Sequence, residues 1–170
     1  MKKLFILFGI VLSCSVMGQG TNVVMHSTYV KPAPTGGGGS NMLTDGTLDS
    51  GATYWNFGTS WAFNTDHAEY DNLANGALGQ ADGDMQTSIE LSTDYTLTFD
   101  LTVVSGTPRF GIYNYALNKA YVSIRSSWSA GNNSIGFTTN SEDISGGGLS
   151  VYAIAGEGEF EIDNLVLTAD

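Results

Sequence analysis

The feature that most constrains the fold is a strict alternation of apolar and polar side chains between residues 95 and 103. The apolar positions, separated by three threonines and one aspartate, are Tyr95, Leu97, Phe99, Leu101 and Val103. Successive side chains of a β-strand point to opposite faces, so this period of two predicts a strand with one buried face. Such a face must be covered by a second layer of structure.

Shorter segments with the same alternation follow along the chain. They are residues 109–115, 121–127, 135–137, 149–153 and 160–167. Turns rich in glycine and asparagine separate them, and a phase change near Asn164 predicts a β-bulge. Many short strands joined by such turns predict an all-β fold, a β-sandwich (jelly roll) of two antiparallel sheets. We expect no helix longer than a turn or two.

The first 18 residues have the organisation of a secretory signal peptide. Met1-Lys2-Lys3 is basic, residues 4–12 are apolar, and small and polar residues follow as far as Gly18. The apolar run is too short to span a bilayer. We therefore expect cleavage after Gly18 and a secreted, extracellular protein without a transmembrane segment.

A second interpretation of this segment depends on Cys14. Leu12-Ser13-Cys14 resembles a bacterial lipobox, in which the cysteine is lipidated and becomes the first mature residue. This alternative predicts an outer-surface lipoprotein. Because Cys14 is the only cysteine, the folded domain contains no disulfide in either case, and its stability must come from its core or from a bound metal.

Residues 19–40 form an extended lead-in, and residues 41–170 have the size of one domain. Asn22 to Val30 could form a single strand, and a proline-containing segment followed by Gly36 to Gly39 is typical of a tether. That strand could add to the sheet edge of a second copy, so the lead-in makes a homo-oligomer one alternative.

The charge balance excludes several partners. Seventeen acidic residues face six basic ones, and two of the six, Lys2 and Lys3, lie in the signal peptide. Such a surface repels nucleic acids and anionic lipid head groups, so we expect no nucleic-acid partner. No nucleophile elbow, H-E-x-x-H motif or phosphate-binding loop occurs, which indicates that the protein is not an enzyme.

Two motifs frame the domain. It opens with Asn41-Met42-Leu43-Thr44-Asp45-Gly46 and an acidic residue, Asp49, followed by Trp55, and it closes with Phe160-Glu161-Ile162-Asp163-Asn164-Leu165. This pattern resembles the galactose-binding-like jelly-roll domains, especially the carbohydrate-binding modules of the family 4, 9 and 22 group. The resemblance implies a structural Ca²⁺ between the first and last strands, with Asp49 and Asp163 at the positions of its ligands. Carboxylates are the oxygen ligands that calcium prefers.

Tyrosines and arginines gather on one predicted hairpin. If Phe110, Ile112, Val122 and Ile124 face the core, alternation places a second set on the opposite face: Arg109, Tyr113, Tyr115, Tyr121 and Arg125. Aromatic rings that stack on sugars, with polar groups to orient them, are typical of glycan sites. The alternative is that Tyr113 and Tyr121 form a cross-strand pair that stabilises the sheet.

The sequence therefore predicts a secreted, non-catalytic carbohydrate-binding module that binds a polysaccharide or oligosaccharide and holds a structural calcium. The alternative is a structural or adhesive extracellular protein that assembles through β-sandwich contacts and its N-terminal strand.

Overall fold

The computed structural model describes residues 39–117, 119–123, 126–139 and 147–170. The signal peptide, Cys14, nearly all of the lead-in and Arg125 lie outside these residues. Two five-stranded antiparallel sheets face each other. This architecture confirms the predicted all-β sandwich.

Sheet A has the strand order β1-β4-β9-β6-β7. Its strands are β1 (Asn56–Phe57), β4 (Gly76–Gln80), β9 (Leu149–Ala153), β6 (Phe110–Tyr113) and β7 (Ala120–Val122). Most neighbours in this order are far apart in sequence, so the sheet is held together by long-range pairing.

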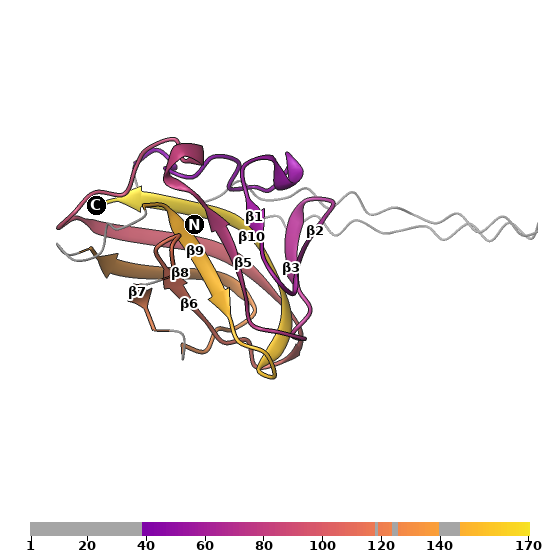
Figure 1. Cartoon of the computed structure of the whole chain (residues 1–170). Helices are drawn as coiled ribbons and strands as arrows, with labels where there is room; N and C mark the ends of the chain where they lie inside the picture. Colours follow the sequence, from indigo (N-terminus) through magenta and orange to yellow (C-terminus); the bar gives the residue numbers. More distant parts are fainter. Residues whose placement is uncertain (1–38, 118, 124–125, 140–146) are drawn as a thin grey trace, which may run out of the picture. The chain divides into compact units, whose positions relative to one another are not determined.

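Sheet B has the order β2-β3-β10-β5-β8. Its strands are β2 (Trp61–Asn64), β3 (His67–Tyr70), β10 (Gly158–Ala169), β5 (Asp94–Gly106) and β8 (Gly131–Thr138). The long strands β5 and β10 run side by side through the sheet (Figure 1).

Two short 3₁₀ turns, η1 (Gly51–Thr53) and η2 (Asp82–Asp84), complete the described elements. Among the described residues, no helix is long and apolar enough to cross a membrane.

The core lies between the sheets and is dominated by aromatic rings. Phe110 of sheet A is fully buried, and its ring centroid lies 5.6 Å from Phe99 and 5.1 Å from Phe160, both of sheet B. Trp128 stacks on the same ring at 4.9 Å, with its indole nitrogen donating to the Phe110 carbonyl. Phe110 therefore joins the two layers.

The opening and closing motifs of the domain lie against each other. Asn41 receives a hydrogen bond from Leu167 N at 3.0 Å and donates one to Leu165 O at 3.1 Å. Leu165 N in turn donates to Gly46 O at 2.8 Å. The pairing of β10 with β5 shifts between Asp163 and Val166, and Asn164 has a φ of 51°, which confirms the predicted bulge.

Candidate functional site

The outer face of sheet A is formed by the residues that alternate with its core positions. Leu149, Val151 and Ala153 of β9 are buried in the core, so Ser150 and Tyr152 point to the other face. Residues paired directly across strands share a face, which groups the set Ala77, Gly79, Gly111, Tyr113, Ser150 and Tyr152.

A hollow of about 400 Å³ lies on this face. Its lining comes chiefly from β1, β4, β9 and the segment after β6: Asn56, Gly58, Thr59, Asn75, Gly76, Ala77, Gly79, Tyr115, Leu117, Ser150 and Tyr152. A Cβ on Gly79 would lie 2.4 Å from the Ser150 hydroxyl and 3.1 Å from the Tyr115 ring. Glycine at this position therefore lets Tyr115 pack close to the strand.

A second hollow of about 400 Å³ shares three residues with the first: Asn56, Gly79 and Tyr115. The Asn56 amide donates to the Tyr115 hydroxyl at 3.1 Å, so this pair is common to both hollows. The second hollow adds the exposed ring of Tyr54 and the carboxylate of Asp84. We call the two hollows together the sheet A groove.

The groove is nearly free of charge. Among the described residues that line either hollow, Asp84 is the one with a carboxylate, and none is basic. Tyrosines, asparagines and small residues predominate. Such a lining offers flat apolar rings and neutral hydrogen-bonding groups, and it suits a neutral polar ligand better than an ion.

The outer face of sheet B is acidic instead. Glu69, Glu159, Glu161 and Asp163 alternate with the core positions of β3 and β10. Partial burial lowers the pKa of His67 on this face. Hydrogen bonds to Asp66 and Glu69 and the neighbouring glutamate charges outweigh that effect and hold the pKa above its usual value. Hydrogen bonds from Asn64 and His67 lower the pKa of Glu69.

Two of the residues predicted to bind sugar lie at the groove. Tyr115 lines both hollows, and the Tyr113 ring packs on Tyr152 with centroids 5.6 Å apart. Tyr113 therefore packs against Tyr152, a lining residue, without lining either hollow itself.

The other predicted residues lie elsewhere. The Tyr121 ring stacks on Phe137 of β8 at 5.0 Å and packs against the core. Arg109 forms an ion pair with Glu157 at 3.6 Å, and Arg125 is outside the described residues. The pairing of β6 with β7 shifts after Ile112, so that Tyr113 lies opposite Ala120. Strict alternation missed this shift, and Tyr113 and Tyr121 are not directly opposed as the alternative had them.

Sequence reasoning missed Asn56, Gly79 and Tyr152. The alternation of residues 149–153 does predict that Tyr152 points outward, and that signal could have found it. Nothing in the sequence shows that β4 lies between β1 and β9, because this order arises from long-range pairing.

The two predicted calcium ligands lie near the junction of the opening and closing motifs. Asp45 accepts hydrogen bonds from the backbone of Asp49 and Ser50 at 3.0 and 2.9 Å, and thereby shapes the turn that carries Asp49. Asp163 is half-buried and lies directly opposite Asp100 on β5. Like charges in this arrangement repel, and a cation beside Asp163 would relieve the repulsion. Carboxylate oxygens are the ligands that calcium prefers, so the site at Asp49 and Asp163 stays a prediction.

No protein-family model matches the sequence, and no curated protein matches it. Solved structures are similar in fold. The second N-terminal cellulose-binding domain of a β-1,4-glucanase from Cellulomonas fimi has a TM-score of 0.56 at 16% identity, over 78% of this chain and 96% of that one.

Two further structures agree with this likeness. A family 4 carbohydrate-binding module gives a TM-score of 0.53 at 15% identity, covering 73% of this chain and 100% of that one. A family 16 module gives 0.51 at 16% identity, covering 75% and 99%. At these identities the comparisons establish the fold: the domain is a jelly roll of the kind found in carbohydrate-binding modules, as the sequence motifs predicted.

Proposed function

We propose that the protein is a secreted, non-catalytic carbohydrate-binding module whose sheet A groove binds a neutral polysaccharide or oligosaccharide. The observation that carries this proposal is a nearly uncharged, tyrosine-lined groove on the outer face of a jelly-roll sheet. The signal-peptide pattern of residues 1–18 supports secretion.

The groove has the groups that sugar binding needs. The rings of Tyr115 and Tyr152 can stack on the apolar faces of sugar rings, while the Asn56 and Asn75 amides can exchange hydrogen bonds with hydroxyls. The Asn56–Tyr115 hydrogen bond and the Tyr113–Tyr152 contact hold two of these rings before a ligand arrives. Side chains ordered in advance lose less entropy on binding.

The composition of the groove also favours binding over catalysis. Glycosidases typically need two carboxylates flanking the scissile bond. Of the described residues lining the groove, Asp84 alone provides one. The Asp84 carboxylate, which lines the second hollow only, can accept hydrogen bonds from sugar hydroxyls.

Replacing groove tyrosines should weaken glycan binding. We expect Tyr152→Ala and Tyr115→Ala each to cost roughly 1–3 kcal/mol, or about 5- to 150-fold in Kd, as for aromatic anchors elsewhere. A glycan array identifies the ligand, and titration calorimetry with that glycan measures the loss.

Tyr121→Ala is the matched control, because its ring stacks on Phe137 outside the groove and its loss should leave Kd unchanged. The opposite pattern, weakened binding by Tyr121→Ala alone, would place the site on the β6–β7 hairpin face instead. If the intact protein binds no glycan on a broad array, the proposed carbohydrate-binding function is wrong. The alternative of a structural or adhesive protein that assembles through β-sandwich contacts then takes its place.

Calcium should stabilise the fold if Asp49 and Asp163 bind it. A ligand that binds only the native state raises the free energy of unfolding by mass action, by about 2.7 kcal/mol at a hundredfold excess over Kd. The melting temperature rises as a result. Melting curves with excess calcium and with chelator should therefore differ, and Asp163→Asn should abolish the difference. Superimposable curves for the unsubstituted protein would rule the site out.

A further inference from the structure

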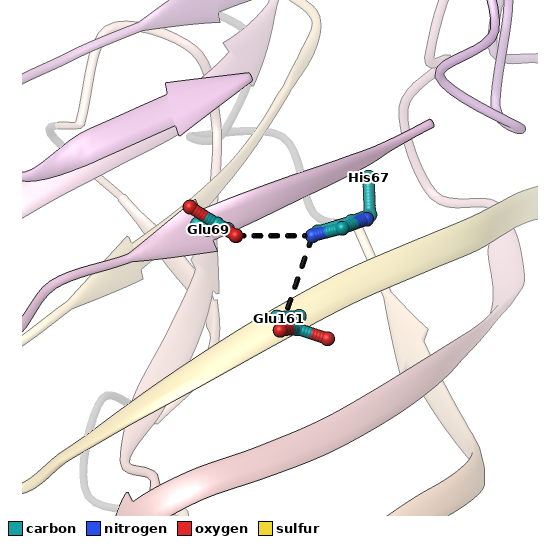
Figure 2. Close-up of side chains that lie close together, drawn as sticks. All are labelled: His67, Glu69 and Glu161. Carbon is teal, nitrogen blue, oxygen red and sulfur yellow. Dashed lines mark hydrogen bonds and ion pairs between the residues drawn. The ribbon is translucent and has the colours of Figure 1, made fainter. Parts of the chain in front are cut away.

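A histidine and two glutamates meet on the outer face of sheet B, away from the groove on sheet A. His67 and Glu69 are two residues apart on β3 and so share a face, and Glu161 lies directly opposite Glu69 on β10. Figure 2 shows both carboxylates directed at the same edge of the imidazole ring. His67 Nε2 lies 3.3 Å from Glu69 Oε1 and 3.9 Å from Glu161 Oε1.

The 3.3 Å separation of His67 and Glu69 is that of two ligands around a small cation, and Glu161 at 3.9 Å is somewhat farther away. One ligand atom from each residue lies within 4.8 Å of the other two. Two ligands at zinc-bond length from a tetrahedral ion are about 3.3 Å apart. The imidazole nitrogen and the two carboxylates therefore need only small side-chain rotations to share one ion, and the strands that carry them are already paired.

The far side of the imidazole is oriented by a third carboxylate. Asp66 Oδ1 lies 3.0 Å from His67 Nδ1. When Nδ1 donates its proton to a carboxylate, the lone pair is on Nε2, the atom that faces the two glutamates. Metal-binding histidines are commonly held in this way. Asn64 Nδ2 donates to Glu69 Oε1 at 2.5 Å, which orients that carboxylate as well.

The cluster opens onto free space. Glu69 and Glu161 line a hollow of about 240 Å³ together with Tyr70, Asp71, Val104, Glu159 and Phe160. All three clustered side chains are half-buried. The hollow borders the two glutamates and not His67, so a cation bound here would have room for water on the glutamate side while its protein ligands are partly shielded from solvent.

Repulsion between the two carboxylates of the cluster favours the binding of a cation. Glu69 and Glu161 are directly opposed, and like charges in directly opposed positions destabilise a sheet. A divalent ion would neutralise both carboxylates and link β3 to β10. One imidazole and two carboxylates suit a borderline first-row ion such as zinc better than calcium, which prefers an all-oxygen set.

We propose that His67, Glu69 and Glu161 form a zinc site, with a water molecule as the fourth ligand on the side of the hollow. This site shares no residue with the sugar-binding groove or with the calcium proposed at Asp49 and Asp163.

The test is calorimetric titration of zinc into the metal-free chain, purified without a histidine tag. We expect one zinc ion per chain. His67→Gln should weaken binding about 100-fold or more and Glu161→Gln at least 10-fold, since even outer groups around metal sites contribute roughly 10- to 100-fold. Glu161→Gln preserves shape, and circular dichroism establishes that both variants fold.

Matched controls separate this site from the other zinc-binding groups of the chain. His26 is the other histidine and Cys14 the only cysteine, so His26→Gln and Cys14→Ser should leave zinc affinity unchanged. Asp163→Asn should also leave it unchanged while removing any calcium response. Absence of zinc binding, or binding that survives both His67→Gln and Glu161→Gln, would overturn the site. Cobalt provides a second readout: its visible absorption bands should be lost in His67→Gln.

Discussion

Replacing Phe110 with alanine should destabilise the domain by about 3–5 kcal/mol, the range for buried aromatic side chains. The Phe110 ring of sheet A is fully buried and contacts Phe99 and Phe160 of sheet B as well as Trp128. Its removal leaves a cavity that the paired strands around it cannot close. Because a domain of this kind is stable by only about 5–15 kcal/mol, a large share of its stability should disappear.

Chemical denaturation measures this loss, and Tyr113→Ala is its control. Tyr113 is three residues further along β6, but it is half-buried on the outer face. Its substitution removes the ring contact with Tyr152, which is worth about 0.5–1.5 kcal/mol. A larger loss of stability in Tyr113→Ala than in Phe110→Ala would mean that the faces of β6 have been assigned the wrong way round.

The sequence predicted those faces because strand alternation is a local property. It identified the core positions of β5, β6, β9 and β10, and the bulge at Asn164 followed from the change of phase within one strand. Long strands with a threonine-rich outer face, such as β5, express this period most clearly. Each of these predictions depends on side chains only a few residues apart.

The strands between residues 56 and 80 could not be predicted in the same way. β1 has two residues, and β4 contains Gly76 and Gly79, which carry no hydrophobic signal. A Cβ on Gly76 would lie 1.7 Å from Thr59 O, so the glycine reflects close packing that only the folded chain reveals. The groove needs β1, β4 and β9 in this order in one sheet, and therefore only part of it could be predicted.

The predicted shared face of Tyr113 and Tyr121 on the β6–β7 hairpin was wrong for a related reason. Alternation alone pairs Tyr113 with Tyr121, but one additional residue on β7 moves Tyr113 opposite Ala120. Unlike the bulge at Asn164, this one falls in a strand of three residues, which is too short for a change of phase to be visible in the hydrophobic pattern. Tyr121 then stacks on Phe137 at the edge where β7 meets β8, a contact between different sheets that the local sequence does not encode.

Gly46→Ala should destabilise the domain by about 3 kcal/mol, as for severe overpacking, although it adds only one methyl group. The added Cβ would lie 1.9 Å from the Leu165 carbonyl oxygen and 2.7 Å from Asn41 Nδ2. Neither neighbour can move freely. Leu165 N donates to Gly46 O, and Asn41 bonds to both Leu165 and Leu167.

Gly136→Ala in β8 provides the comparison, because the nearest atom to its added Cβ is Tyr95 O at an ordinary 3.8 Å. Alanine is favoured over glycine inside a strand by roughly 0.5–1 kcal/mol, so this variant should be as stable as the unsubstituted protein or slightly more. Denaturation midpoints measured side by side should therefore fall for Gly46→Ala and stay level or rise for Gly136→Ala. Equal shifts would mean that the opening segment does not approach β10 so closely, and the hydrogen bonds between Asn41, Gly46 and Leu165 would then be wrong. A large loss of stability confined to Gly46→Ala would explain why the opening motif has a glycine at this position. Gly46 lies where the first segment of the domain crosses the bulge of the last strand, and a side chain has no room there.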